Sequence, residues 1–325
     1  MSNLEKDPVE VLAFPEPVEG RGVEILEPRD VPLGGPRAMS VRRTLPQRAR
    51  SLIGAWCFID HYGPDIVAES GGMTVPPHPH TGLQTVSWLF AGEIEHRDSV
   101  GSHAIVRPGE LNLMTAGRGI QHSEVSLPQT TELHGAQLWI ALPDATRNAE
   151  PFFENFVPTP FDFEGATITV FLGELLGHAS SARTFSRVVG AQLDLPTGTT
   201  LNLPVDPGFE HGLLVDGGAP SVNGHPVARS ELAFVAAGAA AIHIESGDKP
   251  LRALLVGGEP LGEQIVMWWN FIGRSHDEIA EFRRQCQADV IGDENERGRF
   301  GRIRGYDGRP LPAPELPNVR LRPRD

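Results

Sequence analysis

Two short segments of the chain carry residue types that bind metal ions. His78 and His80 stand two positions apart, and His122 and Glu124 repeat this spacing further along the chain. Side chains two positions apart on a β-strand point to the same face, so each pair can direct both members toward one point. Three imidazole nitrogens and one carboxylate oxygen suit a divalent transition metal, and such sets with open positions are typical of non-haem iron. The spacing therefore predicts a metal centre formed by His78, His80, His122 and Glu124.

The residues beside these pairs favour a rigid site. Pro76 and Pro77 precede the first pair and Pro79 separates its members, which fixes φ and reduces the entropy lost on metal binding. Gly117 and Gly119 precede the second pair and allow the backbone to turn sharply there. For several other histidines we expect a structural role: His96, His103, His134, His178, His225 and His276.

Short strands must position the two pairs. The chain has 36 Gly and 29 Pro among 325 residues, and these separate short runs rich in Val, Ile, Leu, Thr and Phe. Such runs, bounded by turn residues, are typical of a β-sandwich or a β-barrel. Examples are Thr85–Phe90, His103–Arg107, Gln137–Leu142, Ala166–Phe171 and Leu251–Val256. We therefore expect an all-β fold.

Helical spacing is nearly absent until the C-terminal part of the chain. Ser275 and Glu278 form a capping box at the start of an amphipathic pattern, which predicts one helix over residues 275–289. Residues 298–325 are rich in Arg, Gly and Pro. We expect this last segment to contribute little to a core and to run over the surface as an extended tail.

The chain contains a weak internal repeat. His122 lies eleven positions after Leu111, and His243 lies eleven positions after Leu232. In both copies a Glu directly precedes the Leu, and a second Glu follows the His by two positions. A repeat of β-rich units indicates a duplicated barrel. The second copy has no upstream histidine pair, so its site is expected to be a structural remnant, with His211 as the only nearby helper.

The repeat suggests four parts. Residues 1–143 would form an N-terminal metal-binding barrel, and residues 163–274 a degenerate second barrel. Between them, residues 144–162 contain several prolines among aromatic residues and are expected to be a linker. Residues 275–325 would form the C-terminal helix and tail.

The composition argues against several classes of function and location. The net charge is −14, which disfavours direct binding to nucleic acid or to an anionic membrane. Cys57 and Cys286 do not indicate a disulfide framework. The N-terminal residues lack an apolar signal core, and the longest apolar stretch, residues 232–242, is too short to span a bilayer. A cytoplasmic location is therefore expected.

The two metal-binding segments also resemble a known family. Residues 77–86 (PHPHTGLQTV) and 115–124 (TAGRGIQHSE) are similar to the two signatures of the pirin family, a branch of the cupin superfamily. Residues 59–64, 92–99 and 269–272 fit the same family. The resemblance covers roughly residues 20–290, and the tail resembles that of the larger bacterial members.

This resemblance implies an all-β bicupin, with two tandem cupin barrels and one iron in the N-terminal barrel. By matching positions, the ligands would be His78, His80, His122 and Glu124. Members of the family are reported to oxidise the flavonol quercetin with molecular oxygen, and others are metal-dependent regulators that bind transcription factors. The chain differs from many members at three positions within the first signature, where it has Thr81, Leu83 and Gln84.

The expected function is therefore that of a metal-dependent dioxygenase of the quercetin 2,3-dioxygenase type with a small aromatic substrate. Fe²⁺ is the expected ion, and Mn, Ni and Zn stay open because affinity follows availability as much as ligand type. Glu124 is the candidate base, since a carboxylate beside a cation is close enough to take the substrate's hydroxyl proton. Candidates for lining the pocket are Phe58, Trp88 and Leu113, although an aromatic residue in a β-barrel belongs to the core more often than to a pocket.

Two other functions are compatible with the same residues. One is a non-enzymatic regulatory protein that senses metal or redox state and binds a partner protein. The other is a metal-assisted isomerisation of a small polar metabolite. That reaction would need basic residues around the metal, and the candidates are Arg97, Arg107 and Arg118.

Overall fold

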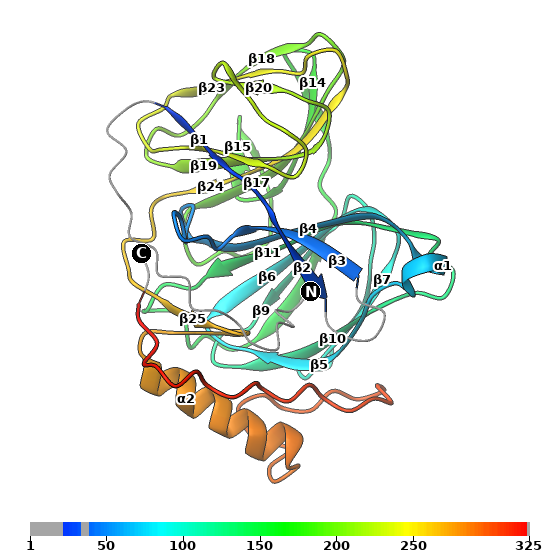
Figure 1. Ribbon diagram of the computed structural model, residues 1–325, viewed down its shortest axis with the longest axis vertical. Coiled ribbons are helices and arrows are strands. Elements are labelled where there is room, and N and C mark those ends of the chain that lie inside the picture. The colour runs from blue at the N-terminus through cyan, green and yellow to red at the C-terminus, as the bar shows by residue number, and fades with distance from the viewer. Residues whose placement is uncertain (1–21, 34–38, 324–325) are drawn as a thin grey trace.

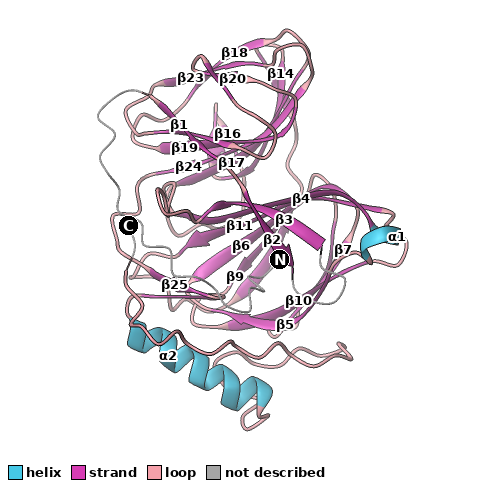
Figure 2. Cartoon of the chain, in the orientation of Figure 1, coloured by secondary structure: helices cyan, strands magenta, loops and turns pink. Residues whose placement is uncertain are grey.

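The computed structural model describes residues 22–33 and 39–323, and strands dominate this part of the chain (Figure 2). The described helices are α1 (Val67–Ser70), α2 (His276–Gln285) and a π-helix over Cys286–Ile291. The strands form two cupin-type β-barrels stacked one above the other in Figure 1, which confirms the predicted all-β bicupin fold. No helix in the described part is long and apolar enough to cross a membrane.

The N-terminal barrel is built from two antiparallel sheets. The larger has the order β12-β9-β6-β11-β4-β3-β2, and the smaller has the order β5-β10-β7-β8. The strands of the larger sheet, in that order, are Phe152–Phe156, Leu111–Thr115, Leu83–Ala91, Glu132–Ala141, Trp56–Ile66, Met39–Leu45 and Arg29–Leu33. Those of the smaller are Thr74–His80, Ile120–Ser126, Ile94–Asp98 and His103–Val106.

The C-terminal barrel repeats this arrangement. Its larger sheet has the order β1-β22-β19-β24-β17-β14-β13, and its smaller sheet has the order β18-β23-β20-β21. The strands of the larger sheet are Val23–Leu26, Leu232–Val235, Glu210–Gly217, Leu251–Gly258, Val188–Leu195, Ala166–Leu172 and Phe161–Phe163. Those of the smaller are Thr200–Pro204, Ala241–Glu245, Ser221–Val222 and His225–Pro226. Two short hairpins complete the strands: β15 (Glu174–Leu175) with β16 (His178–Ala179), and β25 (Val266–Trp268) with β26 (Phe271–Gly273).

Two strands lie where the sequence predicts none. Residues 144–162, the expected linker, contain β12, which pairs with β9 of the first barrel, and most of β13, which pairs with β14 of the second. Strand β1 precedes the whole first barrel in sequence but pairs with β22 of the second barrel (Figure 1). The chain therefore crosses between the barrels at both ends of the N-terminal barrel.

The larger sheets of the two barrels pack against each other through a shared apolar layer. Trp88 from the first barrel stacks on Phe171 from the second, with ring centroids 4.6 Å apart. Leu113 lies in the same layer. Trp88 and Leu113, the candidates for lining a pocket, belong instead to the core between the barrels, because outward-facing residues of these strands are buried by the other barrel. For the aromatic Trp88 the core is also the role that the sequence favours. Phe58 points inward instead and stacks on Trp139 at 4.0 Å.

The two halves differ in which face of the strand carries the repeated histidine. His122 on β10 is fully buried, whereas the side chain of His243 on β23 is 45% exposed beside Glu245. A strand alternates its faces, so this difference corresponds to a shift of one residue. Ile242 and Ile244 point inward in its place and join an entirely apolar cluster. His211 is buried elsewhere, on β19.

The C-terminal segment follows the prediction in part. The Ser275 side chain caps α2 by accepting a hydrogen bond from the Glu278 backbone N–H. The chain then continues as the π-helix to Ile291, so the predicted single helix is two joined segments. The tail is extended, but Phe300, Ala313 and Leu321 are buried against α2 and the β25–β26 hairpin. The expectation of little core in the tail was wrong. Both cysteines are free and buried.

Candidate metal centre

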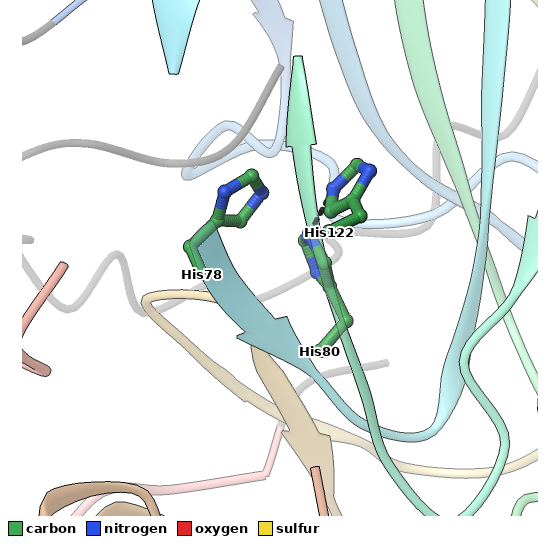
Figure 3. Close-up of side chains that lie close together, drawn as sticks. All are labelled: His78, His80 and His122. Atoms are coloured by element: carbon green, nitrogen blue, oxygen red, sulfur yellow. Dashed lines mark hydrogen bonds between the residues drawn. The ribbon is translucent and has the colours of Figure 1, made fainter. Parts of the chain in front are cut away.

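Three of the predicted side chains converge inside the N-terminal barrel. Strands β5 and β10 are antiparallel neighbours, with His78 opposite His122 in the register. His80 follows on the same face of β5, and its Nε2 lies 3.1 Å from Nε2 of His122. One nitrogen from each of His78, His80 and His122 lies within 4.8 Å of those of the other two (Figure 3). All three residues are fully buried.

Hydrogen bonds to the outer nitrogens orient two of these rings. His78 Nδ1 lies 2.8 Å from the Pro76 carbonyl oxygen and donates to it, so its Nε2 carries the lone pair. His122 Nδ1 lies 3.4 Å from His96 Nδ1, and His96 Nε2 lies 3.2 Å from Asp98 Oδ2. This chain of contacts favours Nε2 of His122 as the metal-binding atom, because the outer nitrogen of a ligating histidine usually donates to a fixed acceptor.

Burial keeps the three imidazoles in the form that binds metal. Burial lowers the pKa of His78 to about 4, although the nearby carboxylate of Glu124 acts in the opposite direction. The pKa values of His80 and His122 are also well below the usual range, first through burial and then through the neighbouring histidines. Among the described residues, Nε2 of His78 is buried without any hydrogen-bond partner. A divalent ion fits this orphaned nitrogen and the neutral donors around it.

Glu124 lies beside this group rather than within it. Its carboxylate is not among the atoms that approach one another within 4.8 Å. The register between β10 and β5 shifts between His122 and Glu124, so that Glu124 stands opposite Val75. The side chain is buried, and its Oε1 accepts a long contact of 3.5 Å from the Ser87 hydroxyl. The structure thus brings three of the four predicted ligands together. The fourth, Glu124, lies on β10, the strand that also carries His122.

A row of buried polar residues crosses the larger sheet of this barrel. In the registers of neighbouring strands, Arg43 stands opposite Asp60, Asp60 opposite Gln137, Gln137 opposite Ser87, and Ser87 opposite Asn112. Arg43 forms a two-pronged ion pair with Asp60 at 2.6 and 2.8 Å, and Ser87 donates to Gln137 Oε1 at 2.7 Å. Sequence reasoning missed this row. Single polar residues within apolar stretches, such as Asp60 and Gln137, were the available signal.

His96 was also assigned a purely structural role, although its position two residues before Asp98 repeats the spacing of the ligand pairs. Another histidine from that group, His134, belongs to a second buried cluster. Nε2 of His134 and Nε2 of His61 lie 2.5 and 2.7 Å from the same oxygen of Asp216. Arg252 binds the other oxygen of Asp216 at 2.6 Å. This cluster joins the two barrels, since Asp216 and Arg252 come from the second.

The basic residues considered for an isomerase are held away from the histidines by surface ion pairs. Arg97 binds Glu95 at 2.8 Å, and Arg107 binds Glu93 at 3.2 Å. Arg118 binds Glu150 at 3.0 Å. Each pair is at least partly exposed. Gln84 near the first signature donates to Thr115 and to the Arg183 carbonyl oxygen. The isomerase interpretation therefore lacks the arginine-rich pocket that it needs.

Comparisons with known proteins agree with this geometry. The family model "Pirin" matches residues 38–140, and the model "Pirin C-terminal cupin domain" matches residues 190–289. A Pseudomonas aeruginosa protein named "Putative quercetin 2,3-dioxygenase PA1205" is 43% identical over 290 residues, which cover 89% of each chain. A "Pirin-like protein" of Caulobacter vibrioides is 34% identical and aligns with 76% of this chain and 88% of its own length.

Solved structures show the same fold. A crystal structure of quercetin 2,3-dioxygenase from Acinetobacter baumannii superposes with a TM-score of 0.85 at 38% identity, covering 93% of this chain and 97% of the other. The Escherichia coli bacterial pirin YhhW, solved in complex with nickel(II), has a TM-score of 0.58 at 20% identity. It covers 74% of this chain and 100% of its own, and at this identity the likeness concerns the fold alone.

Proposed function

Because the chain belongs to the pirin family of cupin proteins, we propose that it is a metal-dependent dioxygenase of the quercetin 2,3-dioxygenase type. The proposed substrates are flavonol-like aromatic enols. The observation that carries this proposal is the convergence of three buried, neutral imidazoles, one of which has an unpartnered nitrogen. The similarity to the named dioxygenases of two bacteria supports the same reaction type.

The proposed ligands are His78, His80, His122 and Glu124. The ion is proposed to be Fe²⁺, with Mn, Ni and Zn as alternatives that suit similar donors. When bound, a divalent ion supplies Lewis acidity, which lowers the pKa of a flavonol hydroxyl. Glu124 follows His122 by two positions on β10 and is buried, which supports its inclusion as the fourth ligand. The carboxylate can then either bind the ion or face the substrate.

The protein's own side chains account for the proton and for the exclusion of water. Glu124 accepts the hydroxyl proton of the substrate as general base, and the Ser87 hydroxyl lies 3.5 Å from its Oε1. The ring of Trp139 packs edge-on against that of His80, with ring centroids 5.1 Å apart. Phe58 stacks on the Trp139 ring. These rings place an apolar wall beside the histidines. A dry wall of this kind strengthens the electrostatic interactions within the site.

The proposal is tested by metal analysis and by oxygen uptake on a panel of flavonols. The iron-loaded protein should consume oxygen with at least one flavonol. His80→Ala should lose most of the bound metal, because the remaining donors cannot complete the same geometry. Glu124→Gln should retain some metal and lose turnover. His243→Ala is the matched control, since its exposed side chain lies in the second barrel, and it should behave like the wild type.

Two outcomes would contradict parts of this proposal. Turnover that is unchanged in Glu124→Gln would remove Glu124 from the role of base. Tight iron binding without oxygen uptake on any flavonol would contradict the dioxygenase assignment. That second result would favour the alternative function, a metal- or redox-sensing regulatory protein that binds a partner protein.

A further inference from the structure

Two of the three converging histidines lie on an edge strand. Strand β5, which carries His78 and His80, is the outermost strand of its four-stranded sheet, and among the described strands it pairs with β10 alone. An edge strand exposes backbone groups that must find other partners. The strand sequence includes Pro76, Pro77 and Pro79, which have no N–H to donate. The free edge therefore presents mainly carbonyl oxygens.

Two segments from the far end of the chain supply the missing donors. The backbone N–H of Ile272, on β26, donates to the Thr81 carbonyl oxygen at 3.0 Å, one residue after His80. The backbone N–H of Leu311, in the C-terminal tail, donates to the Pro77 carbonyl oxygen at 2.8 Å, one residue before His78. In Figure 1 the red tail passes along the side of the barrel formed by β5 and β10.

The same tail is attached to the second histidine-bearing strand. The side-chain amide of Gln121, directly before His122, donates to the Gly301 carbonyl oxygen. Gly301 has a φ of +62°, and a Cβ there would lie 3.0 Å from the Ser99 side chain, so the tail backbone approaches the turn after β7 closely. The Ser99 N–H in turn donates to the Gln121 carbonyl oxygen of β10 at 2.9 Å. The neighbouring Phe300 is buried at 1% exposure and anchors this point of attachment.

Both attachments border one cavity. Its volume is about 400 Å³, and its lining includes Pro77 and Gln121 from the two strands and Gly301 and Tyr306 from the tail. The tail is therefore not packed along its whole length. It touches the strands through hydrogen bonds to residues that are direct chain neighbours of His78 and His122.

We propose that residues 298–323 act as a brace that holds β5 and β10 in the geometry needed for metal binding. The tail positions the histidines through their neighbours and touches neither the metal nor the substrate, so Leu311 and Gln121 are positioning residues. This inference rests on the proposed metal site. Partners that orient metal ligands indirectly commonly change affinity by about 10–100-fold. We expect the hydrogen bonds of the tail to raise the metal affinity in this indirect way, by orienting His78 and His122 through their chain neighbours.

The test uses the full-length protein and Co²⁺, whose visible absorption reports both affinity and ligand geometry. Leu311→Pro removes the single N–H that binds the Pro77 carbonyl, in a segment that already contains Pro310 and Pro312. It should weaken Co²⁺ binding about tenfold or more and alter the visible bands. Leu311→Ala is the matched control, since it removes the side chain and keeps the N–H. Its dissociation constant for Co²⁺ should lie within about threefold of the wild-type value, because the change leaves the orienting hydrogen bond in place.

Gln121→Leu provides a second measurement that does not alter the tail. It removes the amide bound to Gly301 and should weaken Co²⁺ binding in the same way. The inference is overturned if Gln121→Leu and Leu311→Pro bind Co²⁺ like the wild type, or if Leu311→Ala and Leu311→Pro lose equal affinity. If Leu311→Pro fails to fold, the result with Gln121→Leu alone decides. Failure of the wild type to bind Co²⁺ would instead overturn the proposed metal site itself.

Discussion

Part of the candidate metal centre was predictable because the sequence shows the donor residues and their spacing. The alternation of a β-strand places His78 and His80 on one face, and the pairing of β5 with β10 then brings His122 opposite His78. The position of Glu124 depends on a register shift between β10 and β5, which no local pattern reveals. The role of His96 depends on which strand pairs with β10, and pairing is a property of the whole sheet.

His96 provides a prediction at the scale of a single residue. His96→Phe should keep the stacking on Phe153, which has a centroid distance of 4.5 Å, but removes the nitrogen next to His122 Nδ1. We expect metal affinity to fall by about 10–100-fold, the usual effect of losing a partner that orients a ligand. Calorimetric titration with Ni²⁺ measures this change. His103→Ala, exposed on β8, is the control, and equal affinity in both variants would contradict the role given to His96.

At the scale of elements, the strands and the helix start could be read from the sequence, whereas their faces could not. The capping contact between Ser275 and Glu278 is local, and the structure confirms it. The inward or outward orientation of β23 is decided by the apolar core of its barrel, which favours Ile242 and Ile244 over His243. A repeat found by counting positions cannot detect such a shift, because counting ignores strand bulges and turn lengths.

The turn before β10 provides the prediction at this scale. Gly117 has a φ of +51°, and a Cβ there would lie 1.9 Å from the Ala149 carbonyl oxygen. Gly109 has a φ of +73° but would have no heavy atom within 4 Å of a Cβ. Gly109→Ala should therefore cost only the left-handed backbone strain, about 1–2 kcal/mol of unfolding free energy.

Gly117→Ala should be clearly more destabilising than Gly109→Ala, since it adds a clash with backbone to the same strain. Urea denaturation of both variants without metal measures the difference. Because the turn leads directly into Ile120–Ser126, we also expect weaker metal binding for Gly117→Ala. Equal unfolding free energies for the two variants would show that the Ala149 backbone moves away at little cost.

At the scale of the whole molecule, the sequence predicted two barrels and missed how they are joined. Hydrophobic patterns show that a strand face is buried without showing against which partner, so the contact of Trp88 with Phe171 of the second barrel could not be predicted. The contact also contains charged groups that lie far apart in sequence. Burial alone would raise the pKa of Asp216, but hydrogen bonds from His134 and His61 hold it far below its usual range.

This cluster predicts how stability depends on pH. Burial lowers the pKa of His61 to about 4, against the opposing effect of Asp216, with Arg42 and His134 as the other charged or titratable neighbours. A histidine in the unfolded chain has a pKa of about 6.5. Between this pH and about pH 4 the unfolded state therefore binds more protons than the folded state. The stabilisation is therefore complete above about pH 6.5 and decreases as the pH falls, by up to about 1.4 kcal/mol per pH unit.

His61→Gln removes this titration and keeps a side-chain donor for Asp216. The free energy of unfolding of the metal-free protein, measured in urea at pH 7 and pH 5, should change less with pH in this variant than in the wild type. His243→Gln, a change on the exposed face of β23, should show the wild-type dependence. The same dependence in all three proteins would mean that His61 contributes nothing to it.

Strand β1 has a consequence for how the molecule is made. It leaves the ribosome before any residue of the first barrel, yet Val23 is paired with Val235, near the end of the second. Contacts between such distant positions form late, because a long loop must close first. The N-terminal strand must therefore wait until the whole first barrel and the second barrel as far as β22 have been synthesised. Separate expression of the two halves would leave β22 with one open edge.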